Sequence, residues 1–378
     1  MNKSTVRFGI IGCGLMGREF ASAAARWFHL NGDIPAPEIV AVCDVSEQNL
    51  KWFEKINTVK NFYADYREML KNQDIEAVYC ALPHNLHGQV YTDIINAGKH
   101  LLGEKPFGMN ASDFNRIYQA SQARPDIFVR CTSEFPYYPA AQQLIGWYEE
   151  GLFGEIIEAK FAIRHSSDMD INKPINWKRT VAVNGEYGCM GDLGIHTQHI
   201  PFRLGFIPEY VSAQLSNIVK TRPDGEGNTV PCETYDNAVL LCKAQNREGG
   251  EFPMTFEMKR ISPGSTNSVE YAVYGMKMSA VFTTDDPNAI HFIKNDGKTQ
   301  AWSRMVVGQK TLFPVITGEI FEFGFSDSLL QMFAAFISEL RGLPCPFRNF
   351  TLEEAKLSHR LLTAALESYK GNTTVKLA

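Results

Sequence analysis

The chain has 378 residues, of which 44% are hydrophobic and 21% charged, a composition typical of a soluble globular protein with about two or three domains. The formal net charge of −5 disfavours nucleic acid or an anionic membrane as the main partner. No run of about 18 apolar residues predicts a membrane-spanning helix. Because the first strand is expected within a few residues of Met1, we expect no signal peptide and a cytoplasmic protein.

The eight cysteines contain no C-x-x-C pair. Cys13, Cys43 and Cys80 fall in or beside apolar runs that predict strands. Small apolar thiols in such runs are usually buried and reduced. We therefore expect free cysteines, without disulfides and without a metal site.

The first predicted elements are a buried strand at Phe8–Ile11, a glycine turn and an alanine-rich helix. Gly12, Gly14 and Gly17 have the spacing G-x-G-x-x-G, which in this context predicts a dinucleotide site. The start of the helix offers N–H groups to the phosphates. The alternative is a tight turn with accidental glycines, which the flanking strand and helix disfavour. We expect the cofactor to contact the whole loop, which comprises Gly12, Cys13, Gly14, Leu15, Met16 and Gly17.

A Pro/Gly loop leads to the second predicted strand, Ile39–Asp44, which ends in an acid. An acid at this point of a βαβ unit accepts a hydrogen bond from the adenosine ribose 2′-hydroxyl. Its charge would repel a 2′-phosphate, so the sequence favours NAD and does not exclude NADP. Alternatively, Asp44 is a turn residue before a helix that begins after Ser46.

Two further strands are predicted, one at Ala77–Leu82 and one in His100–Pro106 that ends in an acid and a lysine. The carboxyl ends of strands in open parallel sheets face the ligand. The residues that follow these strands are therefore expected at the nicotinamide half of the cofactor: Leu82, Pro83, His84, His87, Glu104 and Lys105.

The motif order glycine loop, L-P-H-N-L-H at 82–87 and G-K-H-L-L-G-E-K-P at 98–106 resembles the Gfo/Idh/MocA family of oxidoreductases. Leu82 and His84 stand where the family typically has Thr and Asn. The resemblance implies an α/β fold with an N-terminal Rossmann domain at 1–132. The remaining 133–378 would form an α+β substrate domain with a large, mostly antiparallel open sheet, and the last helices would be able to pack back on the first domain. Family members self-associate through such a sheet, so a homodimer or homotetramer is implied.

The crossing into the second domain is expected near Ser133–Pro139. Family members often carry an Arg-containing stretch there, whereas this chain has Glu134-Phe135-Pro136. We therefore expect this part of the substrate pocket to be rebuilt.

The segment from Tyr187 to His199 resembles the family's D-x-G-x-H-x-x-D helix start. Asp192 and His196 are four residues apart and share one helix face, where a carboxylate can orient an imidazole. Taken alone, such a pair is usually a surface pair. His199 replaces the last Asp of the pattern, so substrate recognition is expected to differ there.

Candidate substrate contacts lie before and on this helix: Trp177, Arg179, Tyr187 and His199. Aromatic faces and charged groups suit a polyhydroxylated ring. The alternative places Trp177 in the core and Arg179 on a solvated edge, and the residues alone favour neither interpretation.

From Tyr210 onward, alternating runs at 211–219, 238–243, 254–259, 269–274 and 278–283 predict an antiparallel sheet. Helices are predicted at 327–341 and 352–370, the second after a capping box.

The resemblance implies a catalytic set of Lys105, Asp192 and His196. His196 is expected to accept the hydroxyl proton and Lys105 to stabilise the alkoxide, although a desolvated lysine can also be the base. Glu104 would position Lys105. We therefore expect hydride transfer between NAD(P) and a secondary alcohol or ketone of a sugar, cyclitol or sugar derivative.

Two other functions remain open at this stage. One is a catalytically silent NAD(P)-binding regulator, although such a protein need not retain Lys105, Asp192 and His196. The other is an enzyme that recycles NAD during glycoside cleavage. No sequence feature establishes this function.

Overall fold

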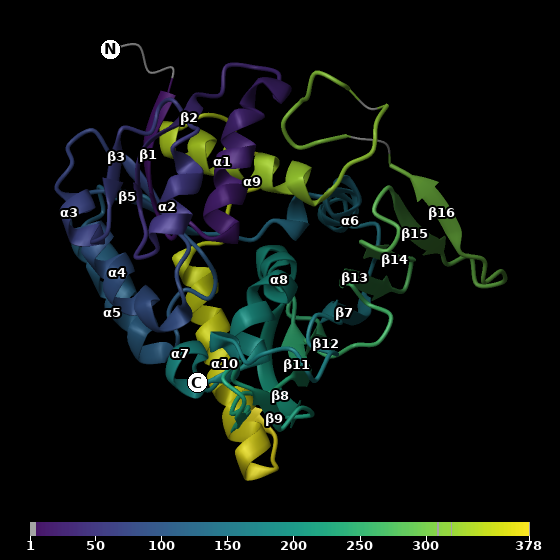
Figure 1. The fold of residues 1–378 in the computed structure, drawn as a ribbon. Coiled ribbons are helices and arrows are strands. Elements are labelled where there is room, and N and C mark those ends of the chain that lie inside the picture. Colours follow the sequence, from purple (N-terminus) through teal and green to yellow (C-terminus); the bar gives the residue numbers. More distant parts are fainter. Residues whose placement is uncertain (1–4, 308–309, 319, 378) are drawn as a thin grey trace. The chain divides into compact units, whose positions relative to one another are not determined.

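A computed structural model describes residues 5–307, 310–318 and 320–377 (Figure 1). The chain divides into two compact units. Unit 1 comprises residues up to Gly108, Ser112–Tyr137 and Lys310–Leu352, and unit 2 comprises Met109–Ala111, Tyr138–Gln309 and the residues from Glu353. Unit 1 thus differs from the domain expected at 1–132, because it continues to Tyr137 and includes a segment from the far end of the chain. The reason is that the 3-10 helix η2 (Phe135–Tyr137) packs against helix α9 (Phe325–Arg341).

Within the described part of unit 1, six parallel strands form a sheet in the order β3-β2-β1-β4-β5-β6. This is the strand order of the dinucleotide-binding Rossmann fold, and the predicted fold class is confirmed. The strands are β1 (Thr5–Ile11), β2 (Ala36–Cys43), β3 (Asn61–Tyr63), β4 (Ala77–Cys80), β5 (His100–Gly103) and β6 (Val129–Cys131). The helices are α1 (Leu15–Ala25), α2 (Glu47–Phe53), α3 (Tyr66–Leu70), α4 (His84–Asn96) and α5 (Ala111–Ala123), with a 3-10 turn η1 (Trp27–His29).

Strand β2 begins at Ala36, inside the segment that we expected to be a Pro/Gly loop. Pro37 is tolerated because it pairs with Val6 of β1 on one side only, and β3 joins β2 from Ala41 onward. A proline removes one donor from a sheet, which costs little where no second neighbour needs it.

Helix α9 lies beside α1 on one face of this sheet (Figure 1). The rings of Phe8, Phe20 and Tyr79 form an aromatic core with Phe333 and Phe336 of α9. Three ion pairs hold α9 in place, namely Arg26–Asp327, Arg130–Glu339 and Arg341–Glu76. The helix predicted at 327–341 therefore completes the core of unit 1.

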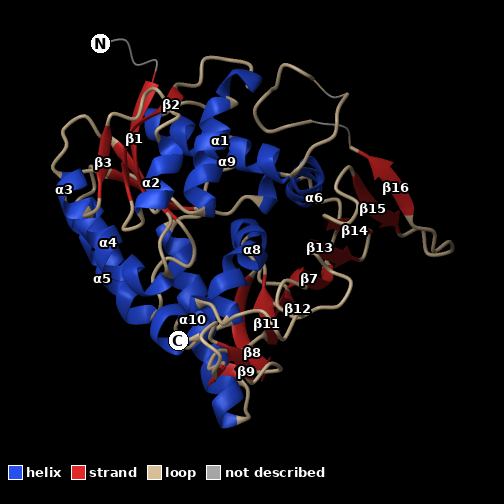
Figure 2. Cartoon of the chain, viewed as in Figure 1, coloured by secondary structure: helices blue, strands red, loops and turns tan. Residues whose placement is uncertain are grey.

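In the described residues of unit 2, nine strands form a sheet in the order β16-β15-β14-β13-β7-β12-β11-β8-β17, whose pairs are antiparallel except β7 with β12 (Figure 2). The predicted antiparallel sheet is confirmed. Its strands are β7 (Ile156–His165), β8 (Ile207–Ser216), β11 (Asn237–Gln245), β12 (Glu251–Lys259), β13 (Asn267–Gly275), β14 (Met278–Thr283), β15 (Ala289–Lys294), β16 (Ser303–Val306) and β17 (Val375–Lys376). A separate hairpin pairs β9 (Thr221–Pro223) with β10 (Thr229–Pro231).

Helices cover one face of the large sheet. They are α6 (Pro139–Glu149), α7 (Val181–Asn184), α8 (Cys189–Leu204) and α10 (Leu352–Gly371), with a 3-10 turn η3 (Trp177–Arg179). Strand β12 shows the alternation clearly, because Phe252, Met254, Phe256 and Met258 are buried while the residues between them are not. Helix α8 packs against β12, β7 and β11, so its side chains are held against a rigid layer.

The opposite face of the large sheet is charged over much of its area. Arg164 of β7 pairs with Glu257 and Glu270 at 3.1 Å each, and Lys243 pairs with Glu251 at 2.7 Å. Some strand residues are exposed and apolar, among them Leu241 of β11, which is 55% exposed, and Val306 of β16. A face that is apolar throughout is therefore not found.

All eight cysteines are free thiols in the structure, seven of them buried, as expected. Among the helices of the described ranges, none combines the length and hydropathy that crossing a membrane requires.

Candidate functional site

The glycine loop of unit 1 connects β1 to α1. The geometric reason for a glycine differs between its positions. Gly12 has φ +91°, and a Cβ there would lie 2.2 Å from the carbonyl oxygen of Ala81. A Cβ on Gly17 would lie 2.3 Å from the carbonyl oxygen of Gly12. By contrast, a Cβ on Gly14 would have nothing within 4 Å. Gly12 and Gly17 are thus required by packing, whereas Gly14 leaves open space where a pyrophosphate can approach the backbone.

Helix α1 begins directly after this open position. Leu15, its first residue, is 74% exposed, and Met16 is half-buried. The helix has no acidic residue in its first turn and no side-chain cap, so its first N–H groups are available to an anion. The open position at Gly14 and the uncapped start of α1 therefore fit the pyrophosphate of NAD.

Asp44 follows β2 and binds the backbone of the glycine loop. Its Oδ2 accepts from the Cys13 N–H at 2.8 Å and from Asn49 Nδ2 at 3.2 Å, while its Oδ1 accepts from the Ser46 N–H at 2.8 Å. The cap of α2 is Ser46, whose hydroxyl accepts from the Asn49 N–H at 3.3 Å. Asp44 is therefore not the helix cap, and its half-buried carboxylate is placed at the loop that was predicted to bind the cofactor.

His87 was expected to border the nicotinamide, but the structure corrects this. Its ring is fully buried, with Nδ1 2.6 Å from the carbonyl oxygen of Pro106 and Nε2 2.8 Å from that of Leu82. Burial lowers the pKa of His87 to about 4, against the opposing effect of the two carbonyls. A neutral ring can donate to only one of these carbonyls, and the fully buried ring leaves no exposed surface for contact with a nicotinamide.

His84 is also buried, whereas Leu82 and Pro83 are half-buried beside it. Direct contact with a cofactor is thus available to Leu82 and Pro83, and His84 is enclosed at the start of α4. The sequence pattern could not separate these cases, because each residue follows the same strand end.

Glu104 and Lys105 follow β5 directly. Tyr79 donates its hydroxyl to Glu104 Oε1 at 2.7 Å, and the Lys105 N–H donates to Glu104 Oε2 at 3.3 Å. Glu104 is buried and Lys105 is half-buried. Glu104 thus binds the backbone N–H of Lys105. That it positions Lys105 and the nicotinamide ribose stays a prediction.

In unit 2, Asp192 and His196 lie one turn apart on α8, as the spacing predicted. Asp192 is buried and accepts from Lys178 Nζ at 3.1 and 3.0 Å. Arg260, which follows β12, lies 3.3 Å from its Oδ2. Two cationic side chains are therefore paired with this carboxylate.

Sequence reasoning missed Arg260 and did not decide between a solvated position and a site position for Lys178. Arg260 is 68 residues from Asp192, and its position after an alternating strand carries no chemical signal. Lys178 could have been found from the sequence, because it directly follows Trp177, a predicted substrate contact. In the structure its ammonium lies 5.6 Å from that ring.

The main chain of α8 is fixed at His196. The Tyr271 hydroxyl of β13 donates to the His196 carbonyl oxygen at 2.7 Å. The His196 side chain is buried apart from a small exposed area. The sheet therefore sets where this imidazole lies.

The candidate substrate residues have different surroundings. Arg179 is fully buried and forms ion pairs with Asp236 and, at 2.8 Å, with Asp168. It is neither a solvated edge nor available to a substrate, because a buried guanidinium needs both carboxylates. Trp177 is half-buried on η3, so of these residues it keeps the most accessible ring.

Tyr187 and His199 are buried, and each has a partner within unit 2. The Tyr187 hydroxyl lies 2.7 Å from Thr363 Oγ1 of α10. His199 Nε2 lies 3.2 Å from Arg203 Nη2, and Arg203 in turn pairs with Glu354 at 2.8 Å. Because an arginine can only donate, His199 Nε2 accepts, which describes a neutral ring. Direct substrate contact by His199 is thus not supported.

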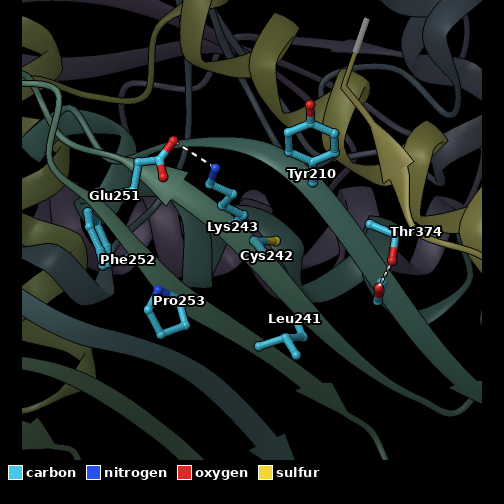
Figure 3. Close-up of a pocket in the computed structure, with 9 residues that line it drawn as sticks. Tyr210, Leu241, Cys242, Lys243, Glu251, Phe252, Pro253 and Thr374 are labelled. Carbon is cyan, nitrogen blue, oxygen red and sulfur yellow. Dashed lines mark hydrogen bonds and ion pairs between the residues drawn. The ribbon is translucent and has the colours of Figure 1, made fainter.

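An open hollow of about 450 Å³ lies on the large sheet (Figure 3). Residues of β8, β11 and β12, together with Thr374, line it, and the Lys243–Glu251 ion pair crosses its rim. None of the predicted site residues lines it. In the described residues, no group of His, Cys, Asp or Glu is arranged to hold a metal ion.

Comparisons with known proteins agree with this geometry. Residues 6–130 match the model of an oxidoreductase family with an NAD-binding Rossmann fold, that of Gfo/Idh/MocA. Over 294 residues the chain is 25% identical to levoglucosan dehydrogenase of Pseudarthrobacter phenanthrenivorans, covering 72% of each protein. Over 119 residues it is 29% identical to inositol 2-dehydrogenase of Salmonella typhimurium, covering 31% of this chain and 34% of that protein.

Two solved structures share the fold over nearly the whole chain. An oxidoreductase domain protein from Kribbella flavida has a TM-score of 0.88 at 21% identity and covers 99% of this chain and 100% of that one. Levoglucosan dehydrogenase in complex with NADH has a TM-score of 0.86 at 20% identity and covers 99% of both chains.

The glycine loop, the Rossmann strand order and the match of residues 6–130 indicate an NAD-binding oxidoreductase. The relatives include a levoglucosan dehydrogenase and an inositol 2-dehydrogenase, which agrees with the predicted dehydrogenase or reductase activity on CH–OH groups. The predicted resemblance to the Gfo/Idh/MocA family is confirmed over residues 6–130, which match that family's NAD-binding Rossmann fold. The prediction of NAD as the cofactor is confirmed with it.

Proposed function

We propose that this protein transfers a hydride between NAD and a secondary alcohol or ketone of a sugar, cyclitol or sugar derivative. The observation that carries the proposal is the Asp192 carboxylate, held by Lys178 and Arg260 one helical turn from His196. A buried carboxylate costs stability unless it is paired, and here it is paired beside an imidazole. The names of the relatives, a levoglucosan dehydrogenase and an inositol 2-dehydrogenase, support this substrate class.

Bound NAD supplies the hydride acceptor or donor. His196 would take the proton of the substrate hydroxyl during oxidation, because an imidazole titrates near neutrality. Asp192 would stabilise the imidazolium that results. Lys105 would donate to the substrate oxygen and stabilise developing negative charge. Exchange of the roles of Lys105 and His196 is the alternative within this proposal.

The proposal is tested first by a substrate screen. Sugars, polyols and their derivatives are supplied with NAD and with NADP in parallel, and the absorbance of reduced cofactor is followed. We expect turnover with NAD on at least one polyhydroxylated substrate. Absence of turnover in both directions, with NADH binding intact, would instead favour a silent nucleotide-binding protein.

Variants then assign the residues. We expect His196→Ala and Lys105→Ala each to lose about a thousandfold or more in kcat while retaining NADH affinity. His291→Ala is a matched control, since this histidine of β15 pairs with Asp286 away from α8. Full activity in either site variant would contradict the proposed catalytic set.

We also propose that the face of the large sheet around Leu241 is where two copies of the chain associate. Leu241 is an exposed apolar side chain that lines the open hollow of Figure 3. Burying such a side chain against a second copy would stabilise a dimer by about 2 kcal/mol for each copy.

A further inference from the structure

Two acidic residues follow neighbouring strands at one edge of the parallel sheet of unit 1. Glu104 follows β5, and Glu134 lies three residues after the end of β6. The Thr132 N–H donates to the Gly103 carbonyl oxygen at 3.0 Å, which keeps the two chains paired beyond the strands. Both glutamates are only 7% exposed. The sheet thus places two buried carboxyl groups at the same edge, together with Lys105.

The charges of these groups act on each other. Burial and, to a smaller extent, the charge of Glu104 together raise the pKa of Glu134 to about 7, against the opposing effects of a backbone hydrogen bond and of Lys105. Two adjacent carboxylates seldom both stay ionised in a buried place. Glu104 accepts from two donors, Tyr79 and the Lys105 N–H, and the raised pKa makes Glu134 the carboxyl group that titrates near neutral pH.

The other titratable groups around Glu134 keep a constant charge near neutral pH. Burial raises the pKa values of Tyr79 and Cys131 well above their ordinary ranges, so both stay neutral. Helix α9 presents apolar groups to this segment, with Met332 Sδ 3.1 Å from the Ser133 nitrogen and the Phe325 ring against Phe135. A change in charge here therefore comes from Glu134 and acts on Lys105.

We propose that Glu134 is a positioning residue that sets the protonation state of Lys105, by holding a proton beside it or releasing that proton to solvent. Ionisation of Glu134 adds a negative charge near Lys105, and this charge favours the ammonium form of the lysine. The inference rests on the proposed function only in giving Lys105 a role toward the substrate, and the charge coupling itself is independent of substrate.

The test measures Lys105 directly, without turnover. The purified full chain is treated with a limiting amine-acylating reagent from about pH 5 to about pH 9, and modification at Lys105 is quantified by peptide mass spectrometry. A single amine would gain about tenfold in rate for each pH unit below its pKa. We expect a smaller gain through the pH range where Glu134 ionises, because the new negative charge stabilises the ammonium form.

Variants separate this coupling from a merely structural role. We expect Glu134→Gln to restore the single-amine profile and to raise Lys105 modification about threefold to tenfold near pH 8. Glu134→Asp, which keeps a carboxyl group, should restore the deviation in part. Glu54→Gln is the control, since Glu54 is an exposed acid of unit 1. Its profile should match that of the unmodified chain.

A second readout follows the carboxyl group itself. Infrared spectra of the same proteins should contain a protonated-carboxyl band that disappears near pH 7 and that Glu134→Gln lacks. A single-amine profile for Lys105 in the unmodified chain overturns the proposal even if Glu134→Gln does not fold. Loss of activity in Lys105→Ala bears on the proposed function alone, since neither readout here depends on a substrate.

Discussion

At the scale of single residues, Asp44 combines two tasks that the sequence could not distinguish. Its carboxylate accepts from the Cys13 and Ser46 N–H groups, and the sequence pattern predicts that it also binds the adenosine ribose of NAD. The same negative charge would meet a 2′-phosphate in NADP. Cofactor preference and loop geometry are therefore linked at one side chain.

Replacing Asp44 tests this link. We expect Asp44→Asn to weaken NAD binding by about tenfold, because hydrogen bonds to a charged acceptor become neutral ones. The ratio of NADP to NAD affinity should rise, since the repelling charge is gone. Titration of both cofactors by fluorescence measures this, with Asp33→Asn in an exposed loop as control. An unchanged NADP to NAD ratio would show that Asp44 only shapes the loop.

The raised pKa of Glu134 also has a consequence for stability. An acid whose pKa rises from 4.5 to about 7 on folding binds more protons in the native state. The contribution of Glu134 to the free energy of unfolding is therefore fully present below its unfolded pKa and is lost as the pH rises through about 7. Glu134→Gln does not titrate, so its melting temperature relative to the unmodified chain should be several degrees higher at about pH 8 than at about pH 5. A difference that does not change with pH would contradict the raised pKa.

At the scale of elements, the glycine loop separates packing from binding. Gly12 and Gly14 are two residues apart, yet a Cβ meets backbone at the first and open space at the second. A substitution at Gly12 must also adopt a positive φ. Substitutions at these two positions can therefore separate the packing role of the loop from its predicted role in cofactor binding.

We expect Gly12→Ala to destabilise unit 1 by about 1–3 kcal/mol or more, because backbone must move. Gly14→Ala should fold with little change in melting temperature but bind NADH at least about tenfold more weakly, because the methyl group occupies the approach to the pyrophosphate. Thermal melts and NADH titrations of both variants check this. Equal losses of stability in the two variants would refute the distinction.

The sequence predicted those elements whose signals are local. The glycine turn, the alternating strands and the helix containing Asp192 and His196 all have periodicity or spacing that neighbouring residues determine. Arg179 could not be placed, because its two carboxylate partners are 11 and 57 residues away. The surroundings of His87 could not be predicted for a similar reason. Its spacing indicates a strand-end histidine, but whether the ring faces a ligand or a carbonyl depends on where Pro106 folds.

At the scale of the whole molecule, association of two copies would use the large sheet. We expect Leu241→Glu to reduce the molecular mass in solution to that of one chain, because a charge replaces an apolar contact. Light scattering after size exclusion measures the mass, and Leu152→Glu, a similarly exposed leucine outside the sheet, is the control. A retained oligomer would place the association elsewhere.

The folding of unit 1 depends on helix α9, which is synthesised long after the strands that it covers. The ribosome completes the six parallel strands by residue 131, but Phe333 and Phe336, which cover Phe8, Phe20 and Tyr79, emerge about 200 residues later. Until then, the aromatic face of the sheet has no native cover and is exposed to wrong contacts. Nascent chains that end before α9 should therefore engage chaperones, and the NAD-binding unit becomes complete only after α9 has been translated.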